Sequence, residues 1–330
     1  MAPGPATHTM RAAVIDDVGP ASNIYTGWLP YPESGPDDVP VAVQAVAVNH
    51  VDTFVRSGAY ATAMDFPFVV GRDLVGTVTE DARGFVRGET VWCNSMGHHG
   101  RQGAAAEHVA VPWQRVYRLP EGVDADTAVA VVHPAATAHL ALHRHAGVNN
   151  GDTVFIGGGA GHVGSAAVVM AAQTSRRVIT SARKEDMDYC LSLGADVALD
   201  YRDERFDARL HAAAPDGVDV YLETSGHHDL ALATAVLAPR GRIVLMSGMQ
   251  ATPQLPAGAL YTKDGSILGF AISNATVDEL AEAATGVNAL LADGLIAPRN
   301  IEVLDLAETA RAHERLERGA ARGTRLILHP

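Results

Sequence analysis

The sequence predicts a two-domain α/β fold that combines a doubly wound parallel sheet with a β-rich unit, and three observations predict it. A buried strand, a glycine turn and a helix of small residues follow one another between Asp152 and Ala172. Further apolar strands then alternate with helical segments, which is the pattern of a parallel sheet with helical crossovers. Between Arg11 and Leu119, short strands are separated by glycine and proline turns, as in a β-barrel. A chain of 330 residues is long enough for two cores.

The individual elements follow from these patterns in chain order. The strands expected in the β-rich unit are Ala12–Ile15, Val39–Val48, Leu74–Thr79, Gly88–Trp92 and His108–Val111. An alanine-rich helix over residues 125–146, broken at Pro134, comes next. The parallel sheet is expected to have strands at 154–156, 177–180, 197–199, 218–222, 242–246 and 266–272, with helices over 161–173, 184–193, 204–214 and 228–237. A helix over 276–291 and a strand over 325–328 follow. The predicted domains are residues 1–125 with 273–330, and residues 126–272.

Composition narrows the class of function. Hydrophobic residues make up 47% of the chain and charged residues 19%, as in an ordinary globular enzyme. A net charge of −13 argues against nucleic acid or an anionic membrane surface as partner, and no apolar run is long enough to span a membrane. The first ten residues lack the apolar segment of a signal peptide, and Cys93 and Cys190 form no paired motif. These features predict a cytoplasmic protein with reduced thiols that acts on a small-molecule substrate.

The glycine turn predicts a dinucleotide site. Gly159, Ala160, Gly161, His162, Val163 and Gly164 fit the pattern G-x-G-x-x-G, directly after a strand and at the start of a helix. In that position the glycines let the backbone approach a pyrophosphate, while the helix N-terminus offers free N–H groups to the anion. The alternative is a tight turn between strand and helix without a ligand.

The residues after the second strand of the sheet favour NADPH over NADH. A site for NADH usually has a carboxylate there, which binds the ribose hydroxyls and repels a 2′-phosphate. This chain instead has Ser181, Ala182, Arg183 and Lys184, a hydroxyl followed by two cations that suit a phosphate. The alternative is a solvated helix start in which the two cations have no ligand.

Several stretches together resemble the medium-chain dehydrogenase/reductase superfamily, and most closely its zinc-free NADPH:quinone reductase, or ζ-crystallin-like, branch. They are Val48–Tyr60, Val70–Gly76, Gly88–Trp92, Ala136–Ala138, the glycine turn, Leu193–Asp196 and Gly241–Val244. The resemblance runs from about Met10 to Leu328. It implies that the β-rich unit is a GroES-like catalytic domain and that the parallel sheet is a Rossmann domain.

The resemblance also raises the question of whether this chain has the residues to bind zinc. The zinc alcohol dehydrogenases of this superfamily carry a lobe of four close cysteines, which this chain lacks. Their catalytic zinc is held by cysteine, histidine and cysteine where this chain has Asn49, Arg72 and His133. One imidazole and an arginine are a poor ligand set for Zn²⁺, so we expect no metal.

The resemblance implies a cofactor site along the whole sheet. Besides the glycine turn and residues 181–184, it places Tyr201 beside the adenosine end of NADPH. It places a further set around the ribose and nicotinamide: Gly226, His227, Ser247, Gly248, Met249, Phe270, Ala271 and Ile272. Tyr201 as a surface residue and Phe270 as a core residue are the alternatives.

On the substrate side, the resemblance implies roles for Asn49, Tyr60 and Thr137 near the nicotinamide. The chain departs from the family at Phe54, where the family has tyrosine, and at His50 and His133, where it has proline and an apolar residue. An imidazole near the nicotinamide can donate a proton at neutral pH, so His50 and His133 are candidate proton donors. The alternative is that both histidines only pack or form structural hydrogen bonds.

The resemblance implies hydride transfer from NADPH to a quinone, enone or related carbonyl compound. Two other interpretations stay open: an enoyl-thioester or specialised-metabolite enone reductase, and a catalytically weak NADPH-binding protein with a structural or sensing role. We also expect a homodimer. The apolar strand Ser266–Ile272 should lie at a sheet edge, where unpaired backbone groups invite a partner strand, and family members commonly associate there.

Overall fold

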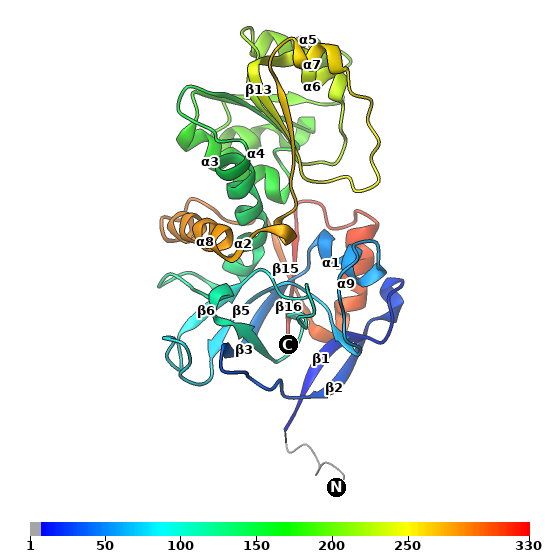
Figure 1. The fold of residues 1–330 in the computed structure, drawn as a ribbon, viewed down its shortest axis with the longest axis vertical. Coiled ribbons are helices and arrows are strands. Elements are labelled where there is room, and N and C mark those ends of the chain that lie inside the picture. The colour runs from blue at the N-terminus through cyan, green and yellow to red at the C-terminus, as the bar shows by residue number, and fades with distance from the viewer. Residues whose placement is uncertain (1–7) are drawn as a thin grey trace. The chain divides into compact units, whose positions relative to one another are not determined.

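The computed structural model describes residues 8–330, which divide into two compact units (Figure 1). The β-rich unit comprises the chain up to His133 together with Leu280–Pro330, and the Rossmann unit comprises Pro134–Glu279. The divisions fall inside two helices, α2 (Ala125–His139) and α8 (Val277–Ala292).

The described part of the β-rich unit contains two sheets, the short helices α1 and α9, and part of each of α2 and α8. A three-stranded sheet has the order β2-β1-β4, and a larger sheet has the order β15-β16-β3-β5-β6-β8, with β7 also paired to β3. Its elements are β1 (Thr9–Ile15), β2 (Tyr25–Pro30), β3 (Asp38–Ala47), α1 (His50–Ser57), β4 (Phe68–Val69), β5 (Asp73–Val78), β6 (Thr90–Cys93), β7 (His108–Pro112), β8 (Tyr117–Arg118), β15 (Ile301–Asp305), α9 (Thr309–Glu317) and β16 (Arg325–His329). Alternate apolar residues of these strands, such as Val39, Val41, Leu74 and Val91, form one buried cluster, as a closed or folded sheet requires.

The Rossmann unit contains a six-stranded sheet of order β11-β10-β9-β12-β13-β14, in which every neighbouring pair is parallel. Its elements are β9 (Thr153–Gly157), α3 (His162–Thr174), β10 (Arg177–Ala182), α4 (Met187–Ser192), β11 (Val197–Asp200), α5 (Phe206–Ala213), β12 (Val218–Glu223), α6 (Leu230–Val236), β13 (Leu237–Leu245), α7 (Ala257–Tyr261) and β14 (Ser266–Gly269). In order along the chain this is 3-2-1-4-5-6, the dinucleotide-binding arrangement. The expected fold class is therefore confirmed.

Helices cover the sheet because its strands are apolar on both sides. Phe155, Ile179 and Tyr221 pack with Leu210 of α5 and Leu230 and Val236 of α6 in one buried cluster. Helices α5, α6 and α7 lie together, and α3 and α4 lie beside each other on strands β9 to β11 (Figure 1). The sheet is thus packed against helices, with the carboxyl ends of all six strands at one edge.

Two expectations about elements were wrong. The helix is not broken at Pro134: α2 continues through it to His139, and the irregularity comes later as a π-helix over Leu140–His145. The last strand of the sheet is also shorter than expected. It lies at the sheet edge but ends at Gly269. The Phe270 ring lies tilted against the His145 ring (centroids 4.6 Å apart), and a 3-10 turn begins at Ile272.

None of the helices in residues 8–330 combines the length and apolarity needed to cross a bilayer.

Candidate active site

The expected cofactor residues gather at one edge of the Rossmann sheet. The glycine turn follows β9, Arg183 and Lys184 follow β10, Tyr201 follows β11, residues 226–227 lie beyond β12, residues 247–249 beyond β13, and residues 270–272 beyond β14. Since all six strands are parallel, their carboxyl ends meet at one edge. This edge is where doubly wound sheets bind ligands.

The three glycines of the motif differ in what a side chain at each position would meet. A Cβ on Gly159 would lie 2.0 Å from Thr180 Oγ1, and one on Gly164 would lie 2.1 Å from the Gly158 carbonyl oxygen. Both glycines are buried, whereas Gly161 is exposed and a Cβ there would meet only the Gly158 oxygen, at 3.2 Å. Gly161 precedes α3, and no side chain caps that helix. The turn is therefore packed on its protein side, with a bare backbone on its open side, which fits a pyrophosphate.

Ser181 and Ala182 lie under the turn and not at the surface. Ser181 is 6% exposed and Ala182 is 2% exposed. The Gly158 N–H donates to Ser181 Oγ at 3.2 Å, and the Gly159 N–H donates to the Ser181 carbonyl at 2.9 Å. These bonds hold the turn onto β10. They give Ser181 a positioning role, while Arg183 and Lys184 remain at the surface.

An arginine pair flanks Tyr201 at the adenosine end of the predicted site. Arg183 Nε donates to the Tyr201 hydroxyl at 3.3 Å, and the Arg202 guanidinium lies 5.6 Å from the centre of the Tyr201 ring. Arg183 is also 3.7 Å from Glu185, and the hydrogen bond to Tyr201 raises the pKa of Arg183. Arg202 was not among the expected site residues. Its position directly after Tyr201 was the available signal.

The loops beyond β12 and β13 pack against each other. His228 Nε2 lies 2.7 Å from the Ser247 carbonyl, and a Cβ on Gly248 would lie 2.7 Å from the Gly226 oxygen. Both glycines have positive φ angles, +82° and +77°, which explains why glycine stands there. His227 and Met249 are exposed on these loops. In this part of the expected site, the loop after β12 and the loop after β13 therefore form one continuous surface.

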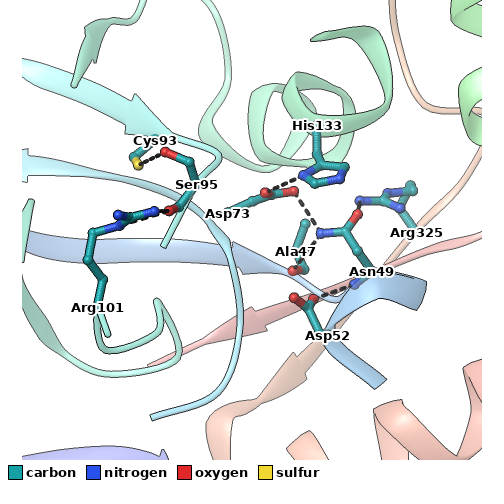
Figure 2. A network of polar contacts seen from close by, with 9 residues as sticks. All are labelled: Ala47, Asn49, Asp52, Asp73, Cys93, Ser95, Arg101, His133 and Arg325. Atoms are coloured by element: carbon teal, nitrogen blue, oxygen red, sulfur yellow. Dashed lines mark hydrogen bonds and ion pairs between the residues drawn. The ribbon is translucent and has the colours of Figure 1, made fainter. Parts of the chain in front are cut away.

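The β-rich unit contains a buried polar network around Asn49 (Figure 2). Asn49 is 5% exposed and precedes α1, and its N–H donates to Asp52 at 2.7 Å as part of a capping box. Its side-chain Nδ2 donates to Asp73 Oδ2 at 2.7 Å and to the Ala47 carbonyl at 3.4 Å. Its Oδ1 accepts from Arg325 at 2.9 Å. Both amide hydrogens of Asn49 are therefore used inside the protein.

The same network reaches His133. His133 Nδ1 lies 3.0 Å from Asp73 Oδ1, so the Asp73 carboxylate stands between the imidazole and the Asn49 amide (Figure 2). Asp73 is fully buried and His133 is 7% exposed. Asp73 begins β5, while His133 lies on α2 and Arg325 begins β16. With Asn49 before α1, four segments distant in sequence thus meet here.

Burial of the charged groups in this network costs desolvation free energy. Burial, and then the Asp73 charge, raises the pKa of Asp52 to about 7. Burial lowers the pKa of Arg72 and of Arg325, and the neighbouring carboxylates oppose that change. Desolvation and the Arg325 charge lower the pKa of His50, at the start of α1. Ionic groups of this kind rarely increase net stability, which favours a functional reason for them.

The remaining substrate-side candidates are spread over both units. Tyr60 is half-buried, with its ring 5.7 Å from that of His98, and Phe54 is 40% exposed on α1. Burial and the Arg72 charge lower the pKa of His98 to about 4. Thr137 lies on α2, in the Rossmann unit, four residues after His133. No group of three or more metal-binding side chains is found within residues 8–330.

Two family models match the chain. The model described as alcohol dehydrogenase GroES-like domain matches residues 35–121, and the model described as zinc-binding dehydrogenase matches residues 163–286. The quinone oxidoreductase of Homo sapiens is 27% identical over 295 residues, covering 87% of this chain and 88% of the human protein.

Solved structures of related proteins have the same fold over nearly the whole chain. One described as an NAD-dependent alcohol dehydrogenase has a TM-score of 0.86 at 26% identity, covering 97% of this chain and 100% of the other. A mycobacterial protein complexed with NADPH has a TM-score of 0.83 at 26% identity, with the same coverage. A GroES-like unit and a Rossmann sheet in one chain are the combination found in nicotinamide-cofactor oxidoreductases of this family. The two family models and the similarity to quinone oxidoreductases support the medium-chain dehydrogenase/reductase superfamily and its ζ-crystallin-like quinone reductase branch.

Proposed function

We propose that this protein is an NADPH-dependent reductase that delivers hydride to a quinone, enone or related carbonyl compound without a metal ion. The observation that carries the proposal is the cofactor edge of the Rossmann sheet. There, an uncapped helix start with a bare glycine backbone lies beside two cations that follow β10. The similarity to quinone oxidoreductases supports the acceptor class.

The residues present fit NADPH. The backbone of residues 160–163 would hold the pyrophosphate, and Arg183 and Lys184 would hold the 2′-phosphate. The loops at Gly226 and Gly248, with residues 270–272, would hold the ribose and nicotinamide. Bound NADPH supplies a hydride from its nicotinamide ring. The protein contributes orientation, and Tyr60 and Thr137 are the proposed donors to the developing oxyanion.

The absence of a metal is part of the proposal. At the three positions where zinc relatives carry ligands, this chain has an amide with both hydrogens engaged, a buried guanidinium and an imidazole bonded to Asp73. A cation at Arg72 would repel Zn²⁺, and an amide is a weak ligand for it. Polarisation of the substrate oxygen is therefore left to hydrogen-bond donors.

The double variant R183A/K184A is expected to lose its preference for NADPH. Two charge-assisted contacts to an exposed phosphate, weakened by salt, correspond to a roughly 10- to 100-fold loss of NADPH affinity. NADH, which lacks the phosphate, should bind as to the wild type. Titration of cofactor fluorescence measures both. R205A/R209A, which removes two exposed arginines paired with Asp203, is the matched control.

Acceptor screening separates the proposed reaction from its alternatives. Oxidation of NADPH with quinones and simple enones, measured by loss of its absorbance, is the expected result. Turnover confined to acyl thioesters would instead support the enoyl-thioester reductase. Tight NADPH binding with no turnover on quinones, enones, aldehydes or thioesters would support the structural or sensing protein.

We also propose a homodimer that pairs through β14. This strand is the edge of the sheet, and its residues Ser266–Gly269 are half-exposed to exposed. An edge strand offers unpaired backbone groups to a second copy. Light scattering should give a mass of two chains, and the mass of one chain would contradict the proposal.

A further inference from the structure

The Asp73 carboxylate is fixed on both sides. Its Oδ2 accepts from Asn49 Nδ2 at 2.7 Å, and its Oδ1 faces His133 Nδ1 at 3.0 Å (Figure 2). Asn49 cannot turn away, because Arg325 donates to its Oδ1 at 2.9 Å and its backbone N–H is bound to Asp52. With both oxygens engaged and no exposed surface, Asp73 has one orientation available.

That fixed carboxylate sets the state of the imidazole. A hydrogen bond from Nδ1–H to a buried carboxylate holds the ring in place and keeps the proton on Nδ1. Proton exchange with any other molecule must then take place at Nε2. In known acid–base dyads, likewise, the carboxylate orients the imidazole and the other ring nitrogen exchanges the proton.

We propose that His133 gives the proton that completes the reduction and that Asp73 is its positioning residue, which rests on the proposed function. Bound NADPH would supply the hydride to the acceptor carbon, and the acceptor oxygen, which would receive the carbonyl π electrons, would then need a proton. That oxygen would take its proton from Nε2 of His133. Solvent would then return a proton to Nε2. His133 and Thr137, a proposed oxyanion donor, are four residues apart and share one face of α2.

Other charged groups lie around the dyad: Asp52 and His50 on α1, Arg72 before β5, and Arg325 on β16. A pH profile of the rate would mix the effects of all of these groups. The test therefore uses variants that separate a residue acting through His133 from one that only supports the fold.

The experiment is a double-mutant cycle with H133Q, D73N and H133Q/D73N, and H211Q, an exposed histidine on α5, as control. H133Q should lower kcat on the order of 100-fold, the usual size of a general-acid effect, with NADPH affinity unchanged. D73N should lower kcat on its own but add little in the H133Q background, because it acts through the imidazole. Equal costs of D73N in both backgrounds would overturn the dyad, as would a kcat of H133Q within about 2-fold of wild type.

A second readout needs neither substrate nor cofactor. In histidine-labelled protein, the Nδ1–H proton of His133 should give a downfield NMR signal that is lost in both D73N and H133Q, and absence of this signal from the wild type would overturn the dyad. H133M, of similar volume, replaces H133Q if that variant fails to fold. Wild-type protein that binds NADPH but reduces no acceptor defeats the proposed function, whereas turnover that persists in H133Q defeats only the dyad.

Discussion

Substituting Gly164 by alanine is expected to damage both the Rossmann unit and its cofactor site. A Cβ there would lie 2.1 Å from the Gly158 oxygen and 2.9 Å from the Gly159 Cα, so backbone must move. Overpacking of this kind costs on the order of 3 kcal/mol, which corresponds to a roughly 100-fold loss of NADPH affinity if the turn is displaced. A glycine-to-alanine change inside a helix would otherwise stabilise it by about 1 kcal/mol.

G161A is the matched control, because Gly164 packs against the backbone of the turn whereas Gly161 lies at the surface. Gly161 is exposed and has a φ of −77°, which alanine adopts freely, so the free energy of unfolding should change by about 1 kcal/mol or less. The added methyl lies where the pyrophosphate would approach, so NADPH binding should still weaken by at least ~10-fold. Unfolding by urea and NADPH titration measure the two effects. G164A protein with wild-type affinity and stability would contradict this description of the turn.

Acid should destabilise the β-rich unit through His313. This residue is 1% exposed on α9, and burial, followed by the Arg56 charge, lowers its pKa to about 3. The unfolded chain binds this proton near pH 6.5 and the folded chain does not, so stability is complete above pH 6.5 and is lost as the pH falls towards 3. At pH 5 this one group accounts for about 2 kcal/mol.

H313Q, which cannot be protonated, should remove that part of the acid sensitivity. The measurement is the free energy of unfolding of H313Q and of the wild type at pH 7.5 and pH 5, with conditions chosen to bracket the transition. The pKa of Asp52, raised to about 7, has the opposite effect, because its stabilising proton is lost as the pH rises. Asp52 is present in both proteins, so the difference between them isolates His313. Equal acid sensitivity of the two proteins would contradict the prediction.

The Rossmann unit could be predicted from sequence because its information is local. Each strand is a short apolar run, each crossover is helical, and parallel strands place their carboxyl ends together. The positions of Arg183, Tyr201 and Gly226 at one edge follow from that rule. The sequence did not predict one contact of Ser181, whose hydroxyl accepts from the Gly158 N–H across the turn.

The network in the β-rich unit could not be predicted, because its contacts are not local. Asn49 meets Asp73 across 24 residues and Arg325 across 276. Asp73 stands in the motif Val70–Gly76, but nothing nearby in the sequence indicates that its carboxylate faces His133. Helix α1 did have a local signal, since Asn49 and Asp52 have the spacing of a capping box. Pro134 gave a wrong local signal, because it predicted a break in the helix and α2 continues through it.

The most direct test of the central claim is a titration of the purified wild-type protein with NADPH and with NADH. The proposed function predicts saturable binding of both, with NADPH at least ~10-fold tighter because Arg183 and Lys184 would meet its 2′-phosphate. Equal affinity for the two cofactors would contradict the assignment of the phosphate site. Failure of both to bind would remove the proposed reductase function.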